Sequence, residues 1–196
     1  MKIRKIYSNK DEIFPDISFN DGLSVIFGEV RNPKDLKKDS HNLGKTILIS
    51  LIEFLLLKKI SDQLFLKKHY DRFKDFTFYL EVSLNSGKYL TIRRDVENNS
   101  KISFKKHETE DQDYRDAAPS DWDHFEIPLG KAKDILDTYL DLSVIDDWNF
   151  RTGISYFLRD QNDYGDIFQI EKFLRSDHID WKPYLAKLLG LDSDNV

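Results

Sequence analysis

The chain contains no cysteine at all and only one methionine among its 196 residues. Without cysteine it can form neither a disulfide bond nor a thiolate metal site, which excludes disulfide-rich and zinc-ribbon proteins. Its five histidines are scattered, at positions 41, 69, 107, 124 and 178. None of them has a partner at the spacing of a metal-binding pair, so the sequence offers no histidine-based metal site.

Long apolar runs are also absent. The longest, residues 47–57, is interrupted by Ser50 and Glu53 and is too short to cross a bilayer. Residues 1–5 lack the apolar stretch of a signal peptide. Because 40% of the residues are hydrophobic, the chain can still bury one substantial core. We therefore expect a globular, cytoplasmic protein with no membrane partner.

A strong positive charge is missing as well. The net charge of −5 argues against a protein that coats nucleic acid indiscriminately. Lysine and arginine nevertheless gather at 34–38, 58–59 and 67–68. Local contact with DNA thus remains open, alongside the plainer interpretation of these lysines as a solvated surface.

Apolar patterning predicts strands on both sides of one helix. Residues 2–7 alternate as an edge strand does, and residues 17–27 are expected to pair with it through a turn at 20–22. Within that span, residues 22–28 read as a buried strand. A largely apolar helix over 47–57 follows. After it, three runs predict an antiparallel meander, at 76–84, 88–94 and 101–106.

The rest of the chain, residues 107–196, is predicted to be a loop followed by helices. Residues 108–123 are acidic and lack periodicity, so we expect a mobile surface loop without chemistry. Helical spacing then predicts helices over 131–140, 149–158 and 181–189.

One short motif carries most of the functional information. Residues 42–48 read Asn-Leu-Gly-Lys-Thr-Ile-Leu, in which Gly-Lys-Thr opens an apolar helix after a β-like stretch. In a phosphate-binding loop, backbone N–H groups surround phosphate oxygens, the lysine reaches the outer phosphates, and the threonine hydroxyl binds magnesium. The expected ligands are ATP and Mg²⁺. The residues assigned to nucleotide binding are Gly28, Asn42, Leu43, Gly44, Lys45, Thr46 and Ile47.

The spacing departs from the usual Gly-x-x-x-x-Gly-Lys-[Ser/Thr] pattern. Asp39 stands where the first glycine belongs, and the nearest earlier glycine is Gly28. The loop is either degenerate or expanded. We favour expansion by residues 29–41, because lengthening a flexible loop costs little, about 0.6 kcal/mol per doubling. The inserted residues could form a lid over the nucleotide or be a tolerated insertion. A chance Gly-Lys-Thr at a helix start is the remaining alternative.

With these elements in place, the chain resembles the N-terminal ATPase half of SMC-like and RecF/RecN-like ABC-type proteins over nearly its whole length. The first-strand pattern Met-x-Ile-x-x-Ile (residues 1–6), the motif at 42–46 and the segment Tyr-Phe-Leu-Arg-Asp-Gln (residues 156–161) carry the resemblance. The expanded loop is similar to that of a bacterial SMC-like subgroup. In such proteins the glutamine of the last segment, the Q-loop, touches magnesium and the attacking water.

The resemblance implies an α/β fold, one half of a P-loop NTPase with an antiparallel β-subdomain and flanking helices. Residues 1–196 would form one lobe: hairpin, phosphate loop and helix in 1–60, the β-subdomain in 75–107, and a helical part in 130–196. It also implies catalytic roles for Lys45 and Gln161, with Thr46 and Gln161 at the metal. Gln169 competes with Gln161 for the Q-loop position.

Two hallmarks of the complete family are absent. No Leu-Ser-Gly-Gly signature occurs, and no acidic pair follows four apolar residues; Asp146 and Asp147 come closest. The resemblance therefore implies that a C-terminal lobe, or a second head in a homodimer, completes the site, in a longer protein or a split ATPase. The whole would serve DNA maintenance, repair or defence, and this chain would bind ATP but hardly hydrolyse it.

Two other functions remain possible at this point. One is a non-catalytic interaction or assembly module whose altered loop no longer binds nucleotide. The other is a self-contained P-loop phosphotransferase that uses Asp146 or Asp147 with magnesium. The antiparallel meander directly after the loop helix disfavours the second, since a compact P-loop kinase would continue into parallel β/α units.

Overall fold

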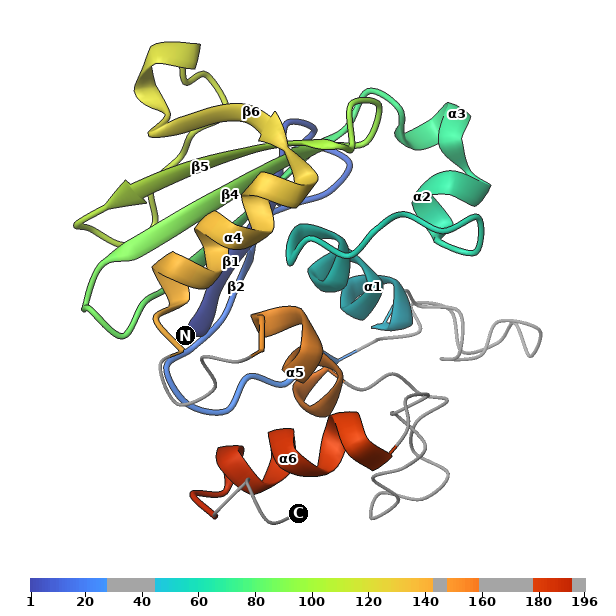
Figure 1. Cartoon of the computed structure of the whole chain (residues 1–196). Coiled ribbons are helices and arrows are strands. Elements are labelled where there is room, and N and C mark those ends of the chain that lie inside the picture. The colour runs from blue at the N-terminus through green and yellow to red at the C-terminus, as the bar shows by residue number, and fades with distance from the viewer. Residues whose placement is uncertain (28–44, 143–147, 159–177, 192–196) are drawn as a thin grey trace. The chain divides into compact units, whose positions relative to one another are not determined.

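The computed structural model describes residues 1–27, 45–142, 148–158 and 178–191 (Figure 1). The chain divides into two compact units, residues 1–132 and 133–196. The first contains one sheet, three short or medium α-helices, a 3-10 helix (Pro119–Asp121) and the start of a further α-helix, and the second is helical in its described part.

Six strands form one antiparallel sheet in the first unit (Figure 1). In sheet order they are β2 (Ile17–Ser18), β1 (Lys2–Ser8), β3 (Thr77–Ser83), β4 (Tyr89–Asp95), β5 (Lys101–His107) and β6 (His124–Pro128). The meander β3-β4-β5 follows the sequence prediction. Strand β6 was not predicted.

The register places apolar residues of successive strands in one row. Ile6 pairs with Leu80, Leu80 with Ile92, and Ile92 with Phe104. All four side chains are fully buried. Because side chains alternate between the two faces of a sheet, this row defines one apolar face.

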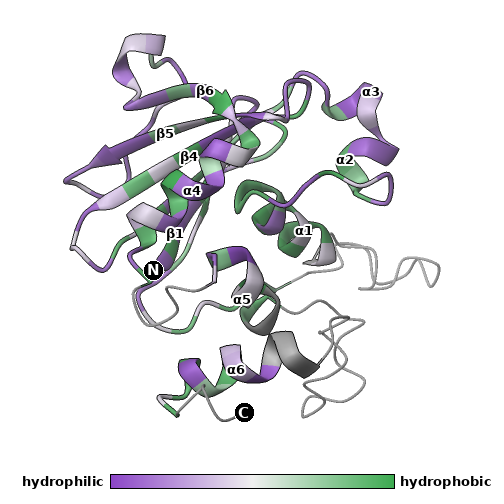
Figure 2. Ribbon diagram, viewed as in Figure 1, coloured by the Kyte–Doolittle hydropathy of each residue, from purple (hydrophilic) through white to green (hydrophobic). Residues whose placement is uncertain are grey.

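Helix α1 (Lys45–Leu55) lies in the same unit and buries Leu51, Phe54 and Leu55. Figure 2 shows hydrophobic residues along much of α1, whereas the two following short helices carry more hydrophilic residues. These are α2 (Phe65–Lys68) and α3 (Tyr70–Phe73), neither of which was predicted. The helix predicted over 47–57 is confirmed, with its start at Lys45.

The opposite face of the sheet is polar and aromatic, and it is covered too. Tyr7 and Tyr79 stack with centroids 4.6 Å apart, and Trp122 packs on Tyr79 at 6.5 Å. Trp122 is only 7% exposed. It belongs to the segment 108–123, which is irregular and mostly exposed, as predicted for a surface loop, but which packs on the sheet through Trp122. The acidic composition of the segment does not reveal the residues that anchor it, because these residues contact strands that are distant in sequence.

The hairpin predicted over residues 2–7 and 17–27 is confirmed only in part. Ile17 pairs with Ile6, as expected, but residues 9–16 connect the two strands rather than a turn at 20–22. Asp21 instead forms an ion pair with Arg4. The chain leaves the sheet after β2, which shortens the predicted strand to two residues.

The buried strand predicted at 22–28 is also wrong over its described part. Residues 22–27 form no strand, and Leu23, Val25 and Phe27 are 86%, 75% and 85% exposed. Their apolar character suggested burial, but no strand of the described sheet pairs with them. An apolar run of residues forms a stable strand only where other strands pair with it, and the sequence pattern does not show whether such strands are present.

The second unit contains most of α4 (Leu129–Leu140), which begins in the first, together with α5 (Phe150–Phe157) and α6 (His178–Leu188). These helices confirm the three predicted ones. Asn149 caps α5 by accepting the backbone N–H of Thr152 at 3.2 Å. Tyr184 is 1% exposed, and a Cβ at Gly153 would come 1.7 Å from its hydroxyl. Glycine is thus required where α5 meets this ring.

The buried tyrosines predict a loss of stability in alkali. Burial raises the pKa of Tyr7 and, less strongly, that of Tyr79. A folded-state pKa above the unfolded value of about 10 stabilises the fold below that pH, and the contribution is lost as the pH rises further. We expect the urea midpoint to fall between pH 8 and pH 11, and to fall less in Tyr7→Phe. An equal fall in both proteins would contradict the assignment to Tyr7.

Candidate nucleotide site at the start of helix α1

The first turn of α1 is the part of the phosphate-binding motif that the structure describes. The helix begins at Lys45, and both Thr46 and Ile47 are exposed there, Ile47 by 46%. The first N–H groups of a helix have no partner within the helix, and they carry the positive end of its dipole. An exposed first turn with a threonine hydroxyl can therefore face an anion.

The rest of the motif lies outside the described residues. This holds for Gly28, Asn42, Leu43 and Gly44, and for the side chain of Lys45. Their assignment to nucleotide binding stays a prediction. The inserted residues 29–41, whether lid or tolerated insertion, fall in the same gap.

The predicted residues from the second half of the chain cannot be placed beside this turn either. Gln161 and its competitor Gln169 lie outside the described residues, as do Asp146 and Asp147. Helix α5 ends at Phe157, and Leu158 is the last described residue before the Q-loop candidate. The role of Gln161 at the metal is therefore untested.

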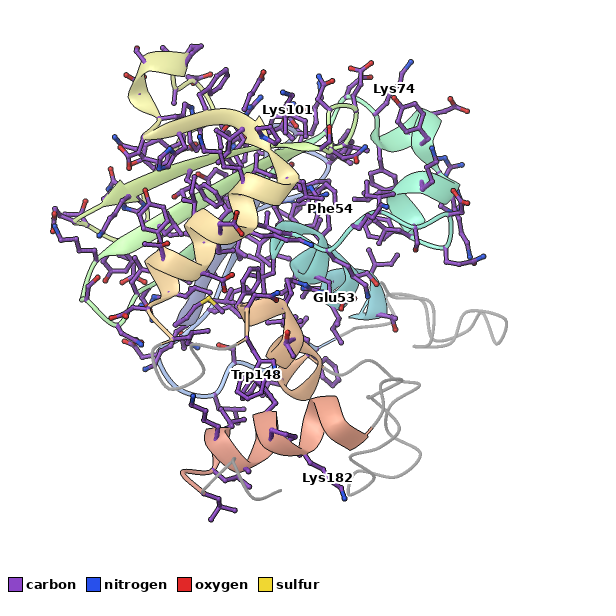
Figure 3. The ribbon with its side chains drawn as sticks, in the orientation of Figure 1. Glu53, Phe54, Lys74, Lys101, Trp148 and Lys182 are labelled. Atoms are coloured by element: carbon purple, nitrogen blue, oxygen red, sulfur yellow. The ribbon has the colours of Figure 1, made fainter. Side chains whose placement is uncertain are left out.

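Helix α1 is held at its other end by a buried arginine of β4. Arg94 is 1% exposed, and its guanidinium lies 4.1 Å from the centre of the Phe54 ring. It donates hydrogen bonds to the carbonyl oxygens of Phe54, Lys58 and Asn99, the last two at 2.8 and 2.7 Å. Figure 3 labels Phe54 on α1, together with Glu53. Arg94 was not predicted, because its position among polar and apolar strand residues gives no local signal.

This contact orients the helix that carries the motif. The carboxyl end of α1 is attached to the sheet, while its first turn, with Thr46, remains exposed. The helix that begins with the turn of Thr46 is thus attached to the antiparallel sheet at its carboxyl end. No group of three or more His, Asp or Glu side chains suited to a metal ion occurs in the described ranges. A magnesium ion bound here would depend on oxygens of the nucleotide and of Thr46.

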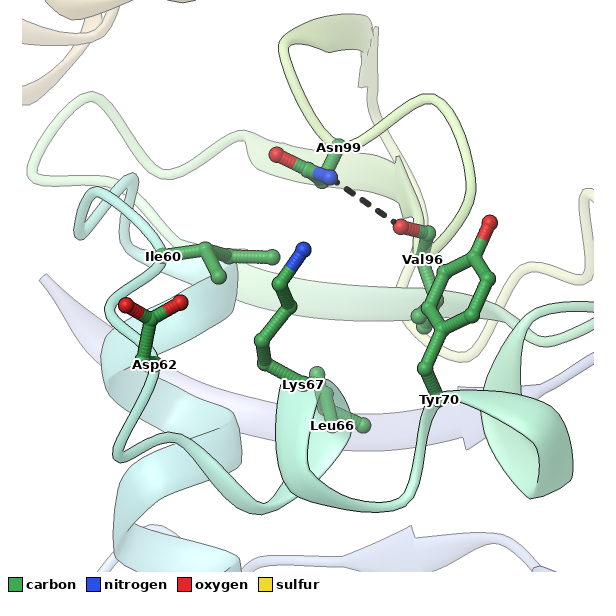
Figure 4. Close-up of a pocket in the computed structure, with 7 residues that line it drawn as sticks. All are labelled: Ile60, Asp62, Leu66, Lys67, Tyr70, Val96 and Asn99. Carbon is green, nitrogen blue, oxygen red and sulfur yellow. Dashed lines mark hydrogen bonds between the residues drawn. The ribbon is translucent and has the colours of Figure 1, made fainter.

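A separate hollow of about 250 Å³ lies beyond the carboxyl end of α1, between α2 and the turn that joins β4 to β5 (Figure 4). Leu66 and Val96 form its buried apolar part. Lys67 and Tyr70 contribute an ammonium group and an aromatic ring. Helix α1 has 11 residues, so at about 1.5 Å per residue the hollow and the exposed first turn lie at opposite ends of it.

Comparison with models of protein families, with curated proteins and with solved structures gave no match. The described helices include none that is both long and apolar enough to cross a bilayer.

Proposed function

We propose that this chain is the ATP-binding N-terminal lobe of an SMC-like ABC-type ATPase. The observation that carries the proposal is the start of α1 at Lys45, directly after Asn42-Leu43-Gly44, with Thr46 exposed in its first turn. The antiparallel strands β3 to β5 after this helix support it, because the family resemblance implies a β-subdomain at that point. They equally disfavour a self-contained phosphotransferase, which would need parallel β/α units.

Each residue of the site would have a separate task. Backbone N–H groups of residues 43–46 would surround the β-phosphate, and Lys45 would neutralise charge on the β- and γ-phosphates. Thr46 would hold magnesium, and Gln161 would sense the γ-phosphate. Hydrolysis of the γ-phosphate requires an aligned water and groups from a second lobe. The chain alone would therefore bind ATP·Mg²⁺ with little turnover, and the complete head would serve DNA maintenance, repair or defence.

Lys45→Ala tests the proposal directly. The substitution removes a charge-assisted contact with phosphate, worth about 1.5 to 3 kcal/mol, so we expect the Kd for ATP·Mg²⁺ to rise ten-fold or more. Calorimetric titration measures the binding, and phosphate release is followed in the same samples. Equal affinity of the mutant and the wild type would contradict the proposal.

Lys88→Ala is the matched control. Lys88 also follows a glycine, but in the turn between β3 and β4, where it forms an ion pair with the exposed Glu108. We expect unchanged ATP affinity. Appreciable turnover by the isolated wild-type chain would favour the phosphotransferase instead.

A second function is favoured by one specific observation. The exposed apolar residues Leu23, Val25 and Phe27 precede the phosphate loop. Exposed apolar groups of this kind suit assembly with another polypeptide. Absence of any ATP binding by the wild type would favour a non-catalytic assembly module over the ATPase lobe.

A further inference from the structure

Residues 59–74 carry an unusual concentration of positive charge. They include five lysine and arginine residues against two aspartates, a net charge of +3 within a chain of net charge −5. The five cations, here called the α2–α3 basic surface, are Lys59, Lys67, Lys68, Arg72 and Lys74. All five are exposed.

These cations differ from most others in the first unit. Lys2, Arg4 and Lys5 of β1 bond with oxygen atoms of other residues, and Arg93 and Lys105 of the sheet form ion pairs. Within the described ranges, no carboxylate forms an ion pair with any member of the α2–α3 basic surface. Five exposed cations that form no ion pair within the described residues favour an external polyanion.

The hollow beyond α1 shares one residue with this surface. Lys67 belongs to both, and Tyr70, on the hollow's wall, lies between Lys68 and Arg72 in the sequence. The Tyr70 side chain is 38% exposed, and the floor beneath is apolar because Leu66 and Val96 are 0% and 1% exposed. Figure 4 shows the Tyr70 ring and the Lys67 side chain, with its ammonium group, lining the same hollow.

Polar groups line the remaining wall. Asn99 uses its amide nitrogen to bond the Val96 carbonyl at 3.2 Å (Figure 4). Its amide oxygen and the carboxylate of Asp62, which also lines the hollow, are hydrogen-bond acceptors. A carboxylate repels phosphate but can accept a bond from an N–H group of a base, such as N3–H of thymine. The hollow thus suits a base better than a phosphate.

We propose that the α2–α3 basic surface binds single-stranded nucleic acid, with the backbone phosphates on its lysines and arginine and one unstacked base in the hollow beside Tyr70. Cationic grooves combined with aromatic platforms are the usual means of binding single strands. A duplex keeps its bases stacked and would leave the hollow unused. An anionic membrane is disfavoured because α2 and α3 have four residues each, too few for an apolar helix face. The inference does not depend on ATP binding at α1.

Fluorescence anisotropy with a labelled 20-nucleotide oligo(dT), at several salt concentrations, tests the phosphate contacts. The variant Lys67→Glu/Lys68→Glu/Arg72→Glu removes three of them. Each contact to a single strand contributes about −0.7 to the slope of log affinity against log salt concentration. We expect the slope to shrink by about 2, and affinity at low salt to fall at least thirty-fold. The matched control, Lys10→Glu/Lys131→Glu/Lys182→Glu, makes the same charge change at three other exposed lysines and should lose far less.

Tyr70→Leu tests the base in the hollow. It keeps an apolar wall but removes the ring, so affinity should fall about five-fold or more while the salt slope stays unchanged. Circular dichroism confirms that every variant is folded, and Lys45→Ala should bind the oligonucleotide as the wild type does.

Equal losses in the two charge variants would overturn the proposal. So would a preference for the same sequence as a duplex with no effect of Tyr70→Leu, or binding to phosphatidylserine vesicles without binding to the oligonucleotide.

Discussion

Replacing Arg94 with methionine is expected to lower the free energy of unfolding of the first unit by about 3 to 4 kcal/mol. The guanidinium is almost wholly buried and donates to three carbonyl oxygens from two segments far apart in sequence. Methionine fills a similar volume but donates nothing, so the Lys58 and Asn99 carbonyls lose these bonds. Hydrogen bonds from a charged group contribute about 1.5 to 3 kcal/mol each. Methionine avoids the free-energy cost of burying a charged group, and this offsets part of the loss. Urea unfolding followed by tryptophan fluorescence measures the change.

Two further variants separate geometry from charge. Arg94→Lys keeps the charge, but one ammonium group cannot replace the planar fork that reaches three oxygens, so we expect a loss of about 2 kcal/mol. Arg72→Met makes the same change at an exposed arginine of α3 and should alter stability by less than about 0.5 kcal/mol. Similar losses for Arg94→Met and Arg72→Met would show that Arg94 does not hold α1 to the sheet.

Elements with a local signature were predicted well. The strands β3, β4 and β5 have apolar alternation bounded by turn residues, and helix α1 has a continuous apolar run. Such patterns depend on neighbours within the same element. They gave the right type for each of these elements, with ends shifted by at most two residues.

Elements that depend on distant partners were missed or mistaken. Residues 22–27 look like a strand, yet no described strand pairs with them. Strand β6 is short and its burial is only partial, so no clear alternation marks it. Segment 108–123 reads as an acidic loop, although Trp122 packs on Tyr79 and Arg115 bonds the carbonyl of Ser8 at 2.7 Å. These contacts join residues 43 and 107 positions apart, a separation that composition does not reveal.

The candidate nucleotide site is predicted from the sequence because its motif is contiguous. Lys45 and Thr46 open a helix, as the sequence predicted. The assignment of Gln161 rests on the family resemblance alone, since it lies outside the described residues. Arg94 could not be predicted as the anchor of α1, because its partners become neighbours only in the folded sheet.

Replacing Glu81 with leucine is expected to release the segment that covers the polar face of the sheet, at a cost of about 3 kcal/mol. Glu81 is fully buried on β3, and its two carboxylate oxygens accept the backbone N–H groups of Asp111 and Gln112 at 3.0 and 3.1 Å. Leucine accepts neither bond, and hydrogen bonds to a charged carboxylate contribute about 1.5 to 3 kcal/mol each. Urea unfolding gives the stability, and hydrogen exchange should show lost protection at the amides of residues 111 and 112.

His107 lies beside the Glu81 carboxylate. Nε2 of His107 lies 3.8 Å from a carboxylate oxygen of Glu81 and 2.9 Å from the Thr91 hydroxyl. A carbonyl only accepts, so Nδ1 of His107 must donate its proton to the Thr109 carbonyl, 2.7 Å away.

Two control variants complete the test of Glu81. Glu81→Gln keeps one acceptor oxygen while removing the charge, so it should cost about half as much as leucine. Glu97→Leu, at an exposed glutamate after β4, should change neither stability nor exchange by a measurable amount. If residues 111 and 112 keep full protection in Glu81→Leu, the carboxylate does not hold the segment, and the aromatic contacts of Tyr7 and Trp122 must suffice.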